Sequence, residues 1–171
     1  SIGVSLESQL LALIDFIKKR KKKKTLIMFP KNNYTELIEK KLAKLNLNNI
    51  KIFKYSPNPE ILTGEIEVLT NYAQRKKNLE LRKKLFEDKE DEQSLKQLNR
   101  LDQLYTLGEV NFDSVIIIDF GNSLKSVLTS LVYTDVNESK VLFTTVNQWF
   151  DESIFYENTI KTLYYPSINY K

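Results

Sequence analysis

The 171-residue sequence contains no histidine and no cysteine. Their absence excludes imidazole general bases, thiol nucleophiles, disulfides and zinc sites built on His or Cys. Glycine and proline are scarce, with four of each. No Walker A or Gly-x-Gly-x-x-Gly arrangement is present to cradle a phosphate. We therefore expect a non-catalytic protein with no cofactor, no metal site and no catalytic residue.

Long apolar runs are also missing. No run approaches the roughly 18–20 residues that a membrane helix needs, and the residues from Ser1 do not form a signal peptide. We expect no membrane insertion. The apolar share of 42% and the charged share of 28% are ordinary for a globular domain.

Arginine is rare although the chain is basic. The net charge is +4, but only four of the 26 basic residues are Arg. Because recognition of phosphates and bases usually recruits Arg for its bidentate geometry, we expect no nucleic-acid partner. We interpret the basic run 18–24 as a helix C-terminus that complements the helix dipole, followed by a solvated turn. The alternative is a patch for a membrane surface or a nucleic acid.

Short apolar segments alternate with amphipathic helical stretches. Their β-branched composition is typical of strands buried on both faces of a parallel sheet. The alternation predicts an α/β fold with a parallel sheet of about five strands, right-handed crossovers and helices on both faces. The predicted strands are 25–29, 50–55, 115–118, 141–143 and 163–165, and the clearest helices are 5–19 and 34–45.

The residues 63–107 contain two apolar helical stripes and no proline. The polar segment Glu87–Glu92 separates the stripes, which predicts an antiparallel helical hairpin inserted in a single lobe that spans residues 1–171. A single uninterrupted helix would run over about 60 Å. We interpret the hairpin as a structural arm, with a partner-binding projection as the alternative.

Asp119 ends a predicted buried strand, the position of the phosphate-accepting aspartate in receiver domains. That chemistry needs an acidic pair after the first strand to hold Mg²⁺. The first strand instead ends in Phe29–Asn32, which contains no carboxylate. We therefore interpret Asp119 as a turn or helix-capping residue.

Hydrogen-bonding side chains follow three predicted strands. Ligands of open parallel sheets gather at the loops that leave the carboxyl ends of the strands. Amides, hydroxyls and one indole suit reversible recognition of a polar small molecule or peptide. The alternative is that asparagine, which is common in this chain, simply occupies turns. The candidate ligand-binding residues are Asn32, Asn33, Tyr34, Asp119, Asn122, Ser123, Thr145, Asn147 and Trp149.

Several segments resemble one lobe of the type 1 periplasmic binding proteins, and most of all the penicillin-binding-protein activator branch. The helical segment from about Asn71 to Leu104 is similar to an insertion in activator-like members. The resemblance spans nearly the whole chain. The segments that carry it are Gly3–Gln9, Leu26–Tyr34, Phe112–Asp119 and Val141–Trp149.

The resemblance implies a Rossmann-like or flavodoxin-like α/β lobe of a bilobed periplasmic protein, with the companion lobe outside this chain. It also implies a small polar ligand or a cell-wall synthase as partner. Thr35-Glu36 departs from the family, which often has a small residue and glycine there. The alternatives are a fragment of a transport receptor for a small polar solute and a cytoplasmic flavodoxin-like regulatory domain.

Overall fold

A four-stranded parallel sheet forms the centre of the protein. The computed structural model describes residues 5–146 and 162–166. The strand order is β2-β1-β3-β4, so the prediction of a parallel α/β sheet is confirmed. Beyond β4, Tyr164 makes a single parallel bridge to Thr144 where a fifth strand was predicted. The strands are β1 (Thr25–Pro30), β2 (Ile50–Tyr55), β3 (Ser114–Ile117) and β4 (Leu142–Thr145).

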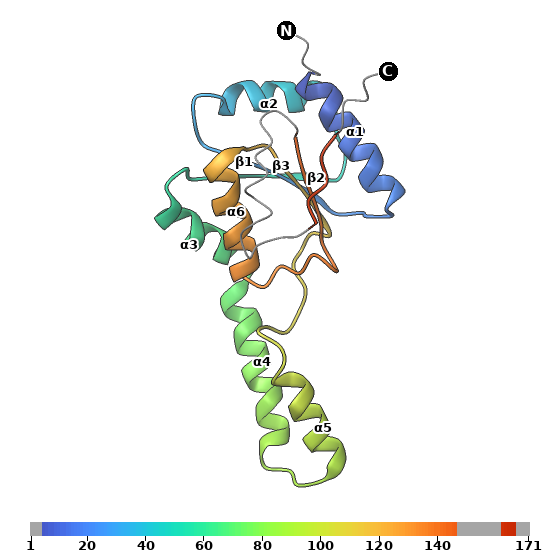
Figure 1. The fold of residues 1–171 in the computed structure, drawn as a ribbon, viewed down its shortest axis with the longest axis vertical. Coiled ribbons are helices and arrows are strands. Elements are labelled where there is room, and N and C mark those ends of the chain that lie inside the picture. The colour runs from blue at the N-terminus through green and yellow to red at the C-terminus, as the bar shows by residue number, and fades with distance from the viewer. Residues whose placement is uncertain (1–4, 147–161, 167–171) are drawn as a thin grey trace.

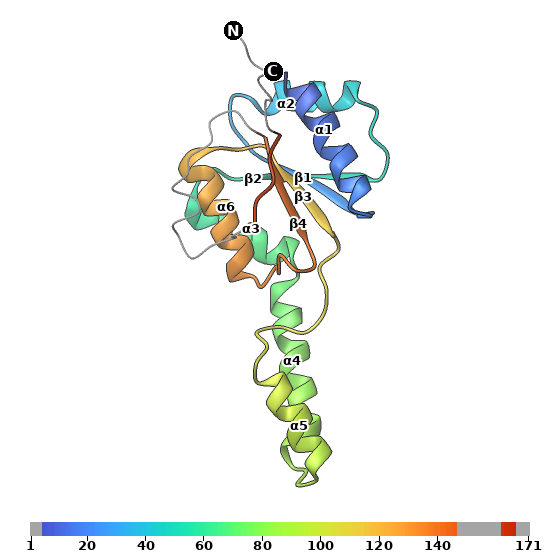
Figure 2. The same ribbon diagram turned by 45° about the vertical axis from the view of Figure 1, so that its right-hand side comes forward.

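Helices cover both faces of this sheet (Figures 1 and 2). The first pair, on one face, precedes β1 and connects β1 to β2. The second pair, on the opposite face, follows β2 and connects β3 to β4. The first pair is α1 (Leu6–Lys19) and α2 (Thr35–Lys44), and the second is α3 (Pro59–Leu69) and α6 (Gly121–Tyr133).

Successive strand residues point to opposite faces and so divide the core in two. Ile27 and Ile116 pack with the buried leucines and isoleucines of α1 and α2. Met28, Val115 and Ile117 pack with the apolar faces of α3 and α6. All of these strand residues are buried, which explains why the strands are continuously apolar rather than alternating.

Helix α1 begins and ends at signals present in the sequence. The Ser5 side chain caps the helix by accepting a hydrogen bond from the backbone N–H of Ser8. At the other end Lys21 has a φ of +61°, and the N–H of Lys22 donates to Ile17 O. This is a Schellman motif with lysine at the usual glycine position. The basic run thus contains the end of α1 and the turn after it.

The segment between β2 and β3 contains three helices rather than two. Pro59 occupies the first turn of α3, where its missing N–H costs nothing. A left-handed Asn71, with φ +54°, then ends α3. After this break α4 (Tyr72–Glu87) leads away from the sheet and α5 (Glu92–Leu101) leads back, and together they project from the body (Figure 1).

Arg75 fixes the base of this projection. Its side chain is 5% exposed. Its guanidinium donates to the carbonyl oxygens of Thr70 and Thr134, which cap the C-termini of α3 and α6. It also donates to Gly108 O, Asp135 O and Thr106 Oγ1. One side chain therefore joins the hairpin, the return segment after α5 and the last turn of α6.

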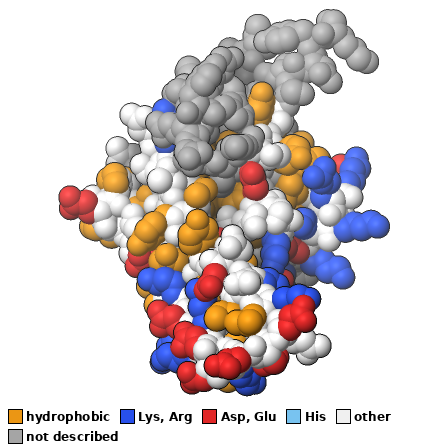
Figure 3. Space-filling view, turned by 60° about the horizontal axis from the view of Figure 1, so that its bottom comes forward, with side chains coloured by type: hydrophobic (Ala, Val, Ile, Leu, Met, Phe, Trp, Pro, Cys, Tyr) orange, Lys and Arg blue, Asp and Glu red, His pale blue; other side chains and the backbone are white. Residues whose placement is uncertain are grey.

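Charges of both signs are interspersed over the hairpin, while Lys and Arg side chains gather at one side of the body (Figure 3). That side is where Figure 1 places the end of α1. Among the described residues, no helix is both long and apolar enough to cross a membrane.

Candidate functional site at the carboxyl edge of the sheet

At one point of the sheet, the connections that leave two neighbouring strands run to opposite faces. The chain leaves β1 through α2 on one face and leaves β3 through α6 on the other, and β1 and β3 are hydrogen-bonded neighbours. Met28 lies opposite Ile117, so the two strands end side by side. In open α/β sheets the crevice at such a switch point is the usual place for a ligand. Both predicted loops, after β1 and after β3, leave from this point.

Asp119 lies at the centre of a buried hydrogen-bond network below this point. Its carboxylate accepts hydrogen bonds from the Tyr55 hydroxyl at 2.7 Å, from the Phe120 N–H at 2.8 Å and from the Ser123 hydroxyl. Asp119 is 6% exposed and Tyr55 is fully buried. The network ties the end of β2 to the first turn of α6.

Burial governs the protonation of both buried groups. It raises the pKa of the Asp119 carboxyl, although the hydrogen bonds from Ser123, Tyr55 and Phe120 oppose the shift. Burial also raises the pKa of the Tyr55 phenol, and the neighbouring Asp119 carboxylate raises it further. Tyr55 is therefore a permanent hydrogen-bond donor at neutral pH. The network positions the loop but presents no free reactive group to solvent.

The loop after β1 folds on its own hydrogen bonds. The Asn32 side-chain oxygen accepts from the Tyr34 N–H at 2.8 Å, and the Asn32 N–H donates to Thr35 Oγ1. This is an Asx turn followed by the first turn of α2. It leaves the Asn33 side chain exposed and the Tyr34 ring 61% exposed.

The loop after β3 also exposes one aromatic side chain and one amide. Phe120 is 51% exposed and Asn122 is exposed in the first turn of α6. Gly121 lies between them with a φ of +58°, a conformation that side chains with Cβ rarely adopt. Each loop thus offers one aromatic ring and one amide to solvent at the switch point.

The predicted residues therefore separate by environment. Asn32, Asn33, Tyr34 and Asn122 are exposed, but the Asn32 side chain is held in the Asx turn, and Ser123 is half-buried with its hydroxyl bonded to Asp119. Thr145 lies inside the sheet, 2% exposed, and its hydroxyl donates to Ile117 O at 2.8 Å. Thr145 therefore contributes no exposed side chain to the candidate site. Asn147 and Trp149 lie outside the described residues.

Two residues of this site were not predicted. The sequence predicts Tyr55 only as the end of a strand, because nothing local indicates that its hydroxyl donates to Asp119. The sequence does contain a signal for Phe120. An aromatic residue in a polar loop directly after a buried strand has no obvious place in the core, which indicates an exposed ring.

In the part of the chain that the structure describes, the acidic side chains do not gather into a metal site. Within residues 5–146 and 162–166, no cluster of three or more Asp and Glu residues could hold a metal ion. Comparison with known proteins found no family model and no curated protein that matches the sequence. The resemblance to type 1 periplasmic binding proteins therefore rests on the sequence motifs alone.

Proposed function

We propose that this chain is a non-catalytic binding lobe that engages a polar ligand or a partner protein at the carboxyl edge of its sheet. The observation that carries the proposal is the pairing of exposed Tyr34 and Asn33 with exposed Phe120 and Asn122 at the switch point. Exposed aromatic rings supply contact area and amides supply directional hydrogen bonds, a combination frequent at recognition surfaces.

The environment of Asp119 supports a binding role over catalysis. A catalytic carboxylate must reach substrate, whereas Asp119 is covered and already accepts three hydrogen bonds. The same burial argues against a phosphate-accepting role in a regulatory domain. The loop after β1, which would have to supply acidic metal ligands, holds Lys31 and Asn32 instead.

We further propose that the lobe belongs to a bilobed bacterial envelope protein of the type 1 periplasmic-binding-protein kind that activates cell-wall synthases. The sequence motifs and the parallel sheet with helices on both faces support this assignment. In such an arrangement the companion lobe would face the surface formed by Tyr34 and Phe120, and the partner would be held between the lobes.

The test compares two aromatic truncations at opposite edges of the sheet. Binding of a purified bifunctional cell-wall synthase is measured by biolayer interferometry with the wild type, Tyr34→Ala/Phe120→Ala and Tyr105→Ala. Tyr105 is 79% exposed and lies near the amino edge, so its truncation reports whether the synthase binds at that edge instead. Truncating a central aromatic contact costs more than about 1–2 kcal/mol, so we expect at least tenfold weaker binding for the double variant alone.

A parallel calorimetric titration against pools of free amino acids and dipeptides addresses the transport alternative. Saturable binding of a free amino acid at about micromolar Kd would favour a transport receptor and contradict the activator assignment. If neither the synthase nor any pool binds, or if Tyr105→Ala weakens binding as much as the double variant, the carboxyl edge is not the binding surface.

A further inference from the structure

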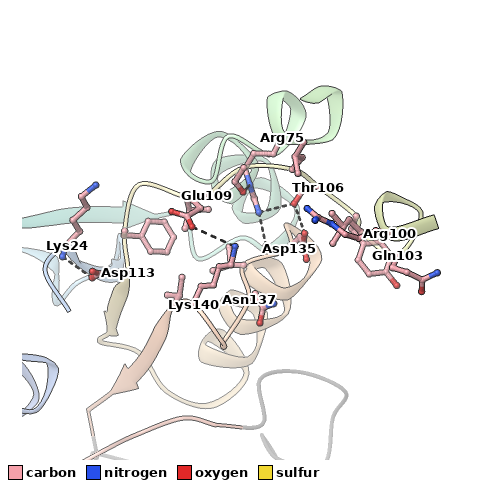
Figure 4. A pocket seen from close by; sticks show the side chains of 18 residues that line it. Lys24, Arg75, Arg100, Gln103, Thr106, Glu109, Asp113, Asp135, Asn137 and Lys140 are labelled. Carbon is pink, nitrogen blue, oxygen red and sulfur yellow. Dashed lines mark hydrogen bonds and ion pairs between the residues drawn. The ribbon is translucent and has the colours of Figure 1, made fainter. Parts of the chain in front are cut away.

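A second candidate surface lies at the opposite, amino-terminal edge of the sheet. A cavity of about 690 Å³ opens there between the return segment that follows α5 and the turn that joins α6 to β4 (Figure 4). Phe112, Val136 and Val141 line it, and all three are at least nine-tenths buried. The cavity therefore has an apolar floor built into the core of the lobe.

Cations are distributed along the length of this cavity. Figure 4 places Lys24 at one end, Arg100 at the other and Lys140 between them. Lys140 lies 3.7 Å from the Glu109 carboxylate, and both side chains are largely exposed. Lys24 and Arg100 have no ion-pair partner in the described part of the chain. Arg75 also borders the cavity, but its donors are committed to the hairpin base.

One wall of the cavity is an irregular segment that is anchored at both ends. At one end Leu107 N–H donates to Arg75 O, and at the other Asp113 N–H donates to Lys24 O. Between these anchors, the backbone groups of 110–112 have no hydrogen-bond partner within the described residues. A fixed segment with unpaired N–H and C=O groups offers main-chain pairing to an incoming chain.

We propose that this cavity binds an extended acidic peptide segment of another protein. The three cations are spaced along the cavity rather than gathered at one point (Figure 4), an arrangement that suits an extended chain with carboxylates toward both ends. Side chains of an extended chain alternate in direction, so apolar residues between the carboxylates reach the floor. Glu109, Asp113 and Asp135 also border the cavity, so a peptide whose carboxylates are spaced to meet the cations, with neutral residues between them, fits better than the continuous negative charge of a nucleic acid.

The probe is a fluorescein-labelled eight-residue peptide in which Glu and Val alternate, followed by anisotropy at low and physiological salt. The variant Lys24→Gln/Arg100→Gln/Lys140→Gln removes the three cations. Its matched control, Lys18→Gln/Lys77→Gln/Arg82→Gln, removes three exposed cations elsewhere. We expect about threefold weaker binding per lost contact, and so more than tenfold for the first variant and less than twofold for the control.

Two altered probes separate charge from backbone pairing. Replacing Glu by Gln in the peptide, or methylating alternate peptide nitrogens, is expected to weaken binding about tenfold each. Thermal unfolding followed by circular dichroism verifies that both triple variants fold alike, as expected for surface substitutions.

Three results would overturn the proposal. The first is no saturable binding of the acidic peptide below about 1 mM. The second is equal binding by the wild type and the cavity variant. The third is tighter binding of a single-stranded oligonucleotide than of the peptide, with the same dependence on the three cations. Tyr34→Ala/Phe120→Ala should leave peptide binding unchanged, so this test and that of the carboxyl edge fail independently.

Discussion

Replacing Arg75 by methionine is the sharpest test of how the hairpin is attached. The substitution keeps most of the aliphatic stem but removes every donor. Burial lowers the pKa of the Arg75 guanidinium and nearby Asp135 opposes the shift, yet an arginine of this kind remains charged. Five hydrogen bonds are lost, four of them to backbone carbonyl oxygens.

The cost follows from the groups left behind. An unsatisfied buried acceptor costs about 1–3 kcal/mol, and water can reach some of the carbonyl oxygens once the guanidinium is gone. We expect Arg75→Met to lower the free energy of unfolding by about 3–5 kcal/mol. This corresponds to a fall of roughly 10 °C in Tm for a chain of this length. Arg75→Lys retains the charge without the planar fork, and we expect about half the loss.

The assay is urea unfolding followed by circular dichroism, with Arg82→Met as the matched control on an exposed face of the same helix. Hydrogen exchange adds a local readout, since the amide of Leu107, which donates to Arg75 O, should lose protection in Arg75→Met. A free energy of unfolding within about 0.5 kcal/mol of the control would refute the reasoning. It would mean that the carbonyl oxygens find equally good partners without the guanidinium.

The further predictions concern backbone conformation and pH. Gly121→Ala should destabilise by about 1–2 kcal/mol because of its positive φ, whereas Gly64→Ala, in a helix with open space around it, should stabilise by about 0.5–1 kcal/mol. Lys21→Gly should raise Tm slightly, because glycine relieves a left-handed position. Relative to Asp119→Asn, the wild type should lose stability as pH rises from 4 to 7. Relative to Asp113→Asn, it should lose stability as pH falls below about 4.

The signs of the pH effects follow from the environments. Burial raises the folded-state pKa of Asp119, so the folded state binds a proton more tightly than the unfolded state. The stability that this proton contributes is lost as pH rises through the folded-state pKa. Burial also opposes ionisation of Asp113, but the N–H groups of Lys23 and Lys24 lower its pKa overall. Urea midpoints between pH 3 and 7 measure both. Parallel pH profiles for the two Asn variants would contradict these assignments, as would equal effects of Ala at Gly121 and Gly64 on Tm.

The sheet was predictable because its signal is local. Continuous β-branched runs such as Val115–Ile117 fit only strands covered on both faces, and Ser5 before an apolar stripe marks a helix start. The break between α3 and α4 was not predictable in the same way. The apolar spacing continues through Thr70 and Asn71 without glycine or proline, and only the left-handed backbone of Asn71 ends the helix.

The sequence predicted which loops form the site. It did not predict which of their side chains are exposed and which are hydrogen-bonded inside the protein. One partner of Asp119 is the Tyr55 hydroxyl, 64 positions earlier in the chain, and no local pattern connects the two. Arg75 is hidden for a related reason. Arg75 lies in α4 among many charged residues, so the sequence predicts a solvated cation. It is buried only because the C-termini of α3 and α6 converge on it.

The direction of α6 connects the two edges of the lobe. The helix begins at the carboxyl edge, where the Asp119 carboxylate accepts from its first turn, and ends at the amino edge, where Arg75 binds its last carbonyl oxygens. Each charge has the sign that stabilises the helix end it meets. The Asp119 carboxylate and the Arg75 guanidinium are both buried and hydrogen-bonded within the protein. Recognition therefore falls to the exposed groups around them. Binding should therefore depend on Tyr34 and Phe120 at one edge and on Lys24, Arg100 and Lys140 at the other, while Asp119 and Arg75 govern stability.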